Sequence, residues 1–272
     1  MILIGTSGYD YTDWREFFYP ADLPREEFLA FYSNYFSALE LNFSYYSMPS
    51  ASALARMVEK SGGRLVFSIK AHRSMTHERV AGNADLAEFN EALSPLREAG
   101  KLGAVLLQFP HSFRASEDSR RYIHRLKQAI DAPLVAEFRS GQWTTPAVYK
   151  WLNSIGVAFC CVDEPDIEGL MPRVALSTAS PAYVRFHGRN AEKWYTHNQA
   201  FERYDYRYSV RELAEWVPLI ERLDKSVSRT LVFFNNHFQA KAVGSARSLC
   251  DLLRMTLNNQ KTRVPDSSAS KT

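Results

Sequence analysis

The chain has 272 residues, of which 46% are hydrophobic and 23% charged, and this composition excludes a disordered, fibrous or collagen-like protein. Lysine and arginine together number 33 against 30 acidic residues, so the net charge of +3 is too small to identify a nucleic-acid-binding protein. Three cysteines, no signal-peptide pattern and no apolar stretch of about 20 residues predict a cytoplasmic protein with no membrane association.

Short β-rich runs alternate with amphipathic stretches along most of the chain. The runs predict eight strands, at residues 2–5, 39–42, 65–72, 104–109, 134–139, 157–162, 183–187 and 229–234. The stretches between and after them predict helices at residues 24–36, 50–60, 85–98, 116–130, 146–154, 210–223 and 240–257. Residues 163–180 follow the sixth strand without a clear helical pattern, which predicts an irregular sixth unit.

Several predicted strands are almost continuously apolar, and strands buried on both faces have this composition. They therefore indicate a parallel sheet covered by helices. About eight β–α units in one series predict an α/β fold of the (β/α)₈ TIM-barrel type, forming a single domain over residues 1–258. An open doubly wound sheet is the alternative. Residues 259–272 are polar and rich in serine and lysine, which predicts a disordered tail.

Every predicted strand ends in polar, charged or aromatic residues. In a TIM barrel the carboxyl ends of all strands meet at one open mouth, where the loops beyond them carry the chemistry. The residues expected at this mouth are Ser7, Glu40, Asn42, Lys70, His77, Gln108, Glu137, Arg139, Asp163, Arg185, His187, Arg189, Trp194, Tyr195, Asn235, Asn236 and His237. Their concentration at one end of the strands predicts a functional site there.

The same strand ends resemble motifs of the YecE-like family, a group of TIM-barrel domains of unknown function. The matching segments are GTSGY at 5–9, ELN at 40–42, FSIK at 67–70, LQFP at 107–110, EFR at 137–139, RFHGR at 185–189 and FNNH at 234–237. The resemblance runs in order through most of the chain, and it implies the barrel fold without implying a reaction. Tyr9, Ser44 and Tyr45 depart from the family's usual Trp, Thr and Phe, which alters one wall of the predicted pocket.

Two carboxylates, Glu40 and Glu137, come from strands on opposite sides of the predicted mouth. Such a pair serves as acid and base where burial separates the two pKa values. We therefore predict Glu40, Glu137 and His187 as catalytic groups. The alternative is that the glutamates form internal ion pairs with arginines and hold the mouth shut. His77 is either a general base in a loop or a helix-cap partner.

Cations, amides and aromatic rings at the other strand ends predict an anionic ligand. Arginine and lysine suit a phosphate or carboxylate, whereas amides and aromatic rings suit a sugar or nucleobase. For the aromatic and amide residues, core packing and turn formation are the alternatives. The predicted ligand-binding residues are Asn42, Lys70, Gln108, Arg139, Arg185, Arg189, Trp194, Tyr195, Asn235, Asn236 and His237.

A divalent metal ion is an alternative ligand, with Asp163, His187 and His237 as its candidate ligands. Neighbouring lysine and arginine disfavour a cation, and the chain has no His-x-His or His-x-x-x-His pair. The GTSG segment at residues 5–8 is neither a dinucleotide-binding fingerprint nor a P-loop. No nucleotide cofactor is therefore predicted.

The sequence leaves three functions open. The first is an enzyme, of hydrolase, lyase or isomerase type, that acts by acid/base chemistry on a small anionic ligand such as a phosphorylated sugar or nucleotide. The second is a metal-dependent phosphodiester hydrolase acting on nucleic acid, by analogy with repair nucleases built on the same barrel. The third is a non-catalytic module that binds nucleic acid or protein through a cationic, aromatic mouth.

Overall fold

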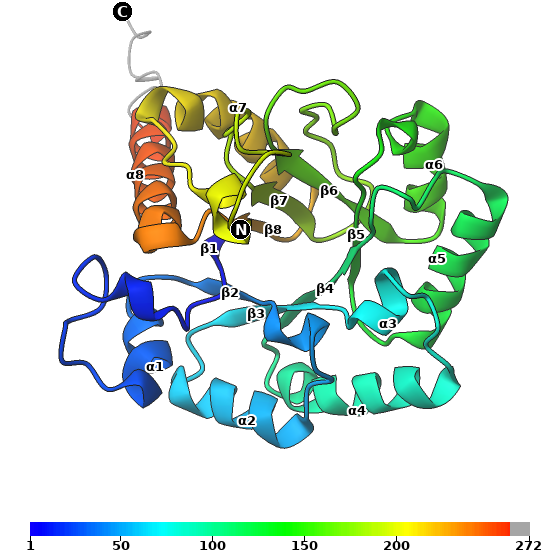
Figure 1. Ribbon diagram of the computed structural model, residues 1–272, viewed down its shortest axis with the longest axis horizontal. Helices are drawn as coiled ribbons and strands as arrows, with labels where there is room; N and C mark the ends of the chain where they lie inside the picture. The colour runs from blue at the N-terminus through cyan, green and yellow to red at the C-terminus, as the bar shows by residue number, and fades with distance from the viewer. Residues whose placement is uncertain (262–272) are drawn as a thin grey trace, which may run out of the picture.

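Eight parallel strands close into a barrel in the computed structural model, which describes residues 1–261 (Figure 1). Hydrogen bonds join neighbours in chain order, and the last strand pairs with the first. The strands are β1 Ile2–Ser7, β2 Ala38–Leu41, β3 Val66–Lys70, β4 Leu102–Gln108, β5 Leu134–Glu137, β6 Val157–Asp163, β7 Ala182–Phe186 and β8 Thr230–Phe234. The predicted TIM barrel is confirmed, and the open-sheet alternative is wrong because β8 returns to β1.

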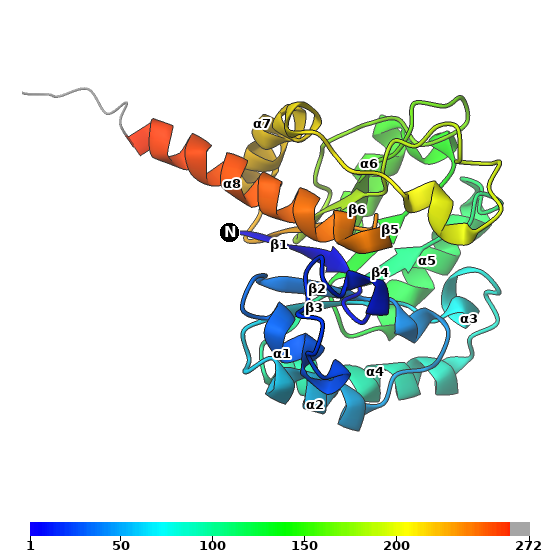
Figure 2. The same ribbon diagram turned by 60° about the vertical axis from the view of Figure 1, so that its left-hand side comes forward.

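Helices surround the barrel (Figures 1 and 2). They are α1 Phe28–Tyr32, α2 Ala51–Lys60, α3 Arg73–Thr76, α4 Asn83–Glu98, α5 Glu117–Ala129, α6 Pro146–Ser154, α7 Val210–Ser226 and α8 Lys241–Lys261. Serine hydroxyls at Ser50, Ser116 and Ser209 accept backbone N–H bonds and cap α2, α5 and α7. Within residues 1–261, no helix is long and apolar enough to cross a membrane.

Three segments show where the predicted elements and the structure differ or agree. Residues 24–36 form only a 3-10 turn at Arg25–Glu27 and the short α1, because aromatic residues with weak helix propensity pack there without a long helix. No helix of the described chain lies between β6 and β7, which confirms the irregular sixth unit. Helix α8 continues to Lys261, and residues 262–272 of the predicted tail lie outside the described residues.

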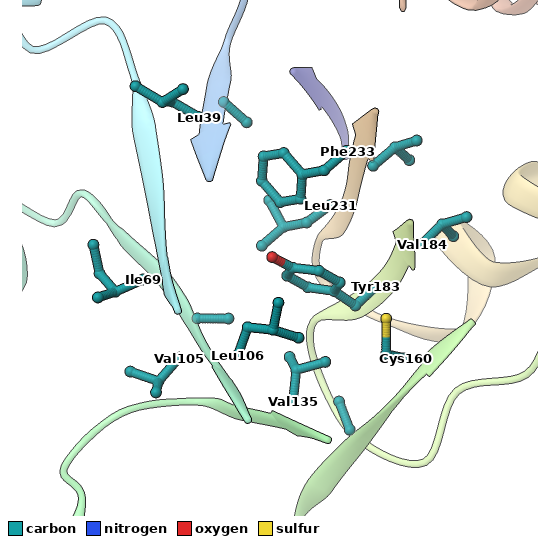
Figure 3. Close-up of a cluster of buried hydrophobic side chains, with 14 of the residues drawn as sticks. Leu39, Ile69, Val105, Leu106, Val135, Cys160, Tyr183, Val184, Leu231 and Phe233 are labelled. Atoms are coloured by element: carbon teal, nitrogen blue, oxygen red, sulfur yellow. The ribbon is translucent and has the colours of Figure 1, made fainter. Parts of the chain in front are cut away.

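The barrel interior is apolar below the mouth. Successive strand residues point to opposite faces, so every second side chain enters the barrel. Figure 3 shows Leu106, Val135, Tyr183, Leu231 and Phe233 directed toward one another, and all five are fully buried. Side chains stacked in this way fill a TIM barrel as a packed core. The polar residues two positions further along the strands therefore enter the interior at its upper end.

Gly5 permits the close approach of β1 and β2. A Cβ atom at this position would lie 1.9 Å from the backbone oxygen of Ala38, far inside any real contact distance. The same oxygen accepts a hydrogen bond from the hydroxyl of Tyr32 on α1 at 3.0 Å. Any side chain at Gly5 would push the strands apart, and it would displace Ser7 and Glu40, which are paired two residues above it.

Candidate functional site

Strand alternation directs the predicted mouth residues toward the barrel axis. Ser68 on β3 points inward, because its Oγ lies 2.7 Å from the hydroxyl of Tyr183 on β7, across the barrel. Lys70, two residues further along β3, shares that face of the strand. The same spacing relates Glu40 to Asn42 on and after β2. Polar residues thus form a layer directly above the apolar core.

Arg185 on β7 lies at the centre of this layer and bridges two buried carboxylates. Its Nη2 and Nε donate to the two oxygens of Glu40 at 2.6 and 3.0 Å, and its Nη1 donates to Glu137 Oε2 at 2.6 Å. Burial alone would lower the pKa of Arg185, but Glu137 and Glu40 outweigh burial and raise that pKa well above its ordinary value. The guanidinium is therefore a permanent charge that fixes both glutamates.

Glu137 at the end of β5 accepts hydrogen bonds from several side chains. Besides Arg185, the donors are Gln108 Nε2 at 2.7 Å and His187 Nε2 at 3.2 Å, and Arg139 Nη2 forms an ion pair with the same carboxylate at 2.9 Å. Burial would raise the pKa of this carboxyl, but the charges of Arg185 and Arg139 hold it well below its ordinary value. Glu137 is thus a fixed anion at neutral pH, and it is a poor proton donor.

Glu40 is as completely enclosed as Glu137. Its Oε2 accepts from the hydroxyl of Tyr183 at 2.7 Å in addition to Arg185, and its side chain is fully buried. The geometry of both glutamates matches the predicted alternative of internal ion pairs. The predicted acid and base pair requires one protonated carboxyl, and Glu137, whose pKa is lowered, does not supply it.

His187, just beyond β7, is buried between Glu137 and Asn235. Asn235 Nδ2 lies 3.2 Å from its Nδ1, so an amide donor on that side and a carboxylate on the other assign the proton to Nε2. Burial and the charge of Arg139 lower the pKa of His187 to about 4. The imidazole is therefore neutral at pH 7 with a defined tautomer.

Lys70 differs from the arginines of the mouth, because its ammonium has no carboxylate within ion-pair distance in the part of the chain that the structure describes. Its Nζ lies 4.4 Å from the centre of the Tyr45 ring. Burial and the charge of Arg185 lower the pKa of Lys70 to about 8, against the opposing attraction of Glu137 and Glu40. Tyr45 also contacts His77, with ring centres 5.0 Å apart.

A cavity of about 480 Å³ lies at the mouth, beside this charged layer. Its described lining contains two arginines, two histidines and no acidic residue; the lining residues are His77, Gln108, Phe109, Pro110, His111, Arg139, Leu170, Trp194, Tyr195, Arg203 and Tyr204. Arg139 connects the cavity to the charged layer, because it forms an ion pair with Glu137 and donates a hydrogen bond to Glu164 Oε2 at 2.8 Å. The cavity wall is therefore cationic and aromatic.

Arg203 and Tyr204 are cavity residues that the strand-end reasoning missed. Arg203 lies over the Trp194 ring at 5.4 Å, its Nε is buried without a hydrogen-bond partner, and it has no carboxylate partner among the described residues. The ring centres of Tyr204 and His187 lie 6.3 Å apart. Both belong to the long segment after β7, where no strand pattern signals which residues fold back over the mouth.

The candidate metal ligands Asp163, His187 and His237 each have different neighbours. Asp163 accepts from Arg189, Tyr208 and Trp216, with Trp216 Nε1 at 2.7 Å. His237 stacks on the Tyr11 ring, with ring centres 4.6 Å apart. Residues 1–261 contain no group of three or more His, Cys, Asp or Glu side chains placed to hold a metal ion.

The remaining predicted ligand residues divide between the cavity and its surroundings. Gln108, Trp194 and Tyr195 line the cavity. Asn42 has a buried Oδ1 without a hydrogen-bond partner in the described chain. Asn236 donates its Nδ2 to the backbone oxygen of Tyr206 at 2.6 Å, which is a structural contact.

Comparison with known proteins places the chain in a family. The model of a protein family described as "Protein of unknown function DUF72" matches residues 3–269. The UPF0759 protein YunF of Bacillus subtilis (strain 168) is 31% identical over 270 residues, covering 93% of this chain and 95% of that protein. A crystal structure of a DUF72 family protein from Thermotoga maritima MSB8 is 34% identical with a TM-score of 0.86, covering 93% of this chain and 99% of the other.

A second DUF72 crystal structure, from Enterococcus faecalis V583, has a TM-score of 0.81 at 22% identity, covering 93% of this chain and 96% of the other. At that identity the likeness concerns the fold alone. The family match and the relatives above 30% identity extend over nearly the whole chain, as the strand-end motifs do. The chain therefore belongs to the DUF72 family, and the predicted resemblance to YecE-like proteins is confirmed.

Proposed function

We propose that this protein is an enzyme that acts by acid/base chemistry on a small anionic ligand bound in the mouth cavity. The observation that carries the proposal is Arg203 in the cavity wall, which has no carboxylate partner among the described residues and whose buried Nε has no hydrogen-bond acceptor. The described lining, which also contains Arg139, His77 and His111, includes no acidic residue. A cationic hollow at the carboxyl ends of barrel strands suits an anion, because an anion supplies the charge that the wall lacks.

Arg203 and Arg139 are the proposed anion-binding groups. Arg203 has an unused guanidinium edge, and its buried Nε is a donor without an acceptor. Arg139 is held in place by Glu137 and Glu164, so its position is set before any ligand arrives. The rings of Trp194, Tyr195 and Tyr204 line the same cavity and suit the faces of a sugar or nucleobase. A phosphorylated sugar or nucleotide fits both features.

His77 is the proposed base, because it lines the cavity and is neutral at physiological pH. Burial and the charge of Lys70 lower its pKa below the ordinary value for histidine. His187 lies behind Tyr204, where its Nε2–H is a hydrogen-bond donor to Glu137 and its Nδ1 faces the amide of Asn235. In this proposal Glu40 and Glu137 are positioning residues that orient Arg185, Arg139 and His187.

Thermal shift measurements test the binding part of the proposal. Inorganic phosphate, ribose 5-phosphate and AMP are each added to the protein, to Arg203→Gln and to Arg56→Gln, an exposed arginine on α2 that serves as the matched control. A ligand present at 100 times its Kd increases the free energy of unfolding by about 2.7 kcal/mol, which raises Tm by roughly 5–10 °C for a chain of this size. We expect that rise in the unmodified protein and in Arg56→Gln, and its loss in Arg203→Gln.

Two outcomes would overturn the proposal. The first is an equal Tm rise in Arg203→Gln and the unmodified protein, which would place the anion elsewhere. The second is the absence of any shift with these three anions, together with oligonucleotide binding that falls steeply with salt; this pair would favour the nucleic-acid-binding module. For any phosphorylated compound that binds and is converted, His77→Gln is expected to lower kcat while leaving the Tm shift in place.

A further inference from the structure

Lys70 has the least compensated charge in the layer above the core. It lies on the inward face of β3, two residues above Ser68, at the end of the strand where the mouth opens. Arg139, Arg185 and Arg189 all form ion pairs, with N···O distances of 2.6–2.8 Å in their shortest contacts. The Lys70 ammonium instead contacts the face of Tyr45, and no carboxylate lies within ion-pair distance in the described chain.

A structural lysine would normally carry its charge out to water along its flexible stem or pair it with an acid. Lys70 has no acidic partner in the described chain, and its side chain is only partly exposed at the mouth. The ring that its ammonium contacts, Tyr45, also contacts His77 of the cavity wall. Beside it, Asn42 follows β2 with a buried, unpartnered Oδ1. A cation without an acidic partner, next to a buried acceptor without a donor, is typical of a site prepared for a ligand.

We propose that Lys70 is a nucleophile that forms an imine with the aldehyde or ketone carbon of an anionic substrate. This inference rests on the proposed function, because an anion held by Arg203 and Arg139 is what brings the carbonyl group to the mouth. The substrate class is therefore a phosphorylated carbonyl compound, such as a sugar phosphate in its open-chain form.

The proposed reaction needs the neutral amine and no further reagent. The nitrogen of Lys70 attacks the carbonyl carbon, the C–N bond forms, and the C=O π pair moves to the oxygen. Two protons leave the nitrogen and two reach that oxygen, so one water departs as the C=N bond forms. With a pKa of about 8, roughly a tenth of the Lys70 amine is neutral at pH 7, about two hundred times more than for an ordinary lysine. His77, which contacts the same Tyr45 ring as Lys70, is the proposed group that accepts and returns a proton.

Borohydride trapping tests the inference on the intact protein. Pyridoxal 5′-phosphate, a phosphorylated aromatic aldehyde, is used as a reagent at pH 7 and below stoichiometric amounts, and sodium borohydride then converts any imine to a stable amine. Peptide mass spectrometry locates the added mass. We expect Lys70 to be labelled at least about tenfold more than the exposed Lys150 on α6, and excess inorganic phosphate to suppress only the Lys70 label.

Variants and controls separate this inference from the proposed function. Lys70→Arg is expected to lose the dominant label, while Lys150→Arg keeps it. Equal labelling of Lys70 and Lys150 in the unmodified protein would overturn the imine, whatever the variants do. If that happens while phosphate still raises Tm in an Arg203-dependent way, only the imine fails. If phosphate neither raises Tm nor suppresses a Lys70 label, the anion-binding proposal fails as well.

Discussion

Two clusters of buried charge lie near the mouth of the barrel and differ in what they leave unpaired. The axial cluster consists of Glu40, Glu137, Arg139 and Arg185 inside the barrel. The peripheral cluster forms around Asp163 at the end of β6, where Arg189, Tyr208 and Trp216 bind its two oxygens at 2.6–2.9 Å. Both contain fully buried carboxylates with arginine partners.

The peripheral cluster is complete in itself. Arg189 donates to Glu215 as well as to Asp163, and none of these three residues is in the described lining of the cavity. The axial cluster reaches the cavity through Arg139 and Gln108 and lies beside Lys70, which has no carboxylate partner in the described chain. Buried charge therefore does not by itself mark a ligand site, since ion-pair networks also serve structure. The groups that remain unpaired distinguish the two clusters.

Replacement of Arg185 is expected to have the largest effect on stability. In Arg185→Leu the carboxylates of Glu40 and Glu137 remain buried without their shared guanidinium. Removing one partner of a buried ion pair costs about 3–5 kcal/mol in the free energy of unfolding. Urea denaturation measures this loss. A loss below about 1 kcal/mol would mean that the axial cluster contributes no more than a surface ion pair.

Acidification is expected to destabilise the axial cluster through His187. Its pKa is about 4 in the folded protein and about 6.5 in an unfolded chain, so between these values the unfolded state binds the proton and the folded state does not. The stability due to a neutral His187 is full above pH 6.5 and is lost as the pH falls toward 4. Relative to His187→Gln, the protein should lose about 3 kcal/mol across this window. An NMR spectrum with a charged His187 ring at pH 6 would contradict this.

Asp163→Asn tests the peripheral cluster and should lower the free energy of unfolding by less than Arg185→Leu does. Hydrogen bonds to charged groups contribute about 1.5–3 kcal/mol, and the asparagine retains one acceptor oxygen. Arg189 and Arg173 are 16% and 38% exposed, so water can solvate both after the charge is removed. We expect a loss of about 2 kcal/mol in urea denaturation and an unchanged Tm shift with phosphate. A lost phosphate response would place the peripheral cluster in the ligand site.

Lys70→Met should give the smallest change, and in the opposite direction. Removing a partly buried charge without an acidic partner is expected to stabilise the protein by about 1 kcal/mol at pH 7. Because the pKa of Lys70 is lowered to about 8, its destabilising effect persists below pH 8 and fades as the pH rises toward 10.4. Tm values at pH 7 and pH 10 measure this, with Lys150→Met as the exposed control. Destabilisation at pH 7 would show that Lys70 has a structural partner.

Much of the mouth follows from strand periodicity. Glu40, Lys70, Glu137, Arg185 and His187 lie at or just beyond strand ends, and a closed parallel barrel must gather them around one axis. Their pairing could not be read from spacing along the chain. Arg185 forms ion pairs with Glu40 and Glu137 across the barrel, and these contacts depend on where the folded strands place the three side chains. The predicted acid and base pair assumed separated pKa values, whereas the surrounding guanidinium groups hold Glu137 ionised.

The sequence alone determined the fold, because apolar strands, helix caps and the regular alternation of strands and helices are local patterns that can be read directly from the residues. It also determined which strand ends are polar. Only the tertiary structure decided which charges neutralise one another and which remain, since that depends on distances between residues more than 100 positions apart, such as Glu40 and Arg185. For the same reason the role of Arg203, folded back over the mouth from an irregular loop, became visible only in the folded chain.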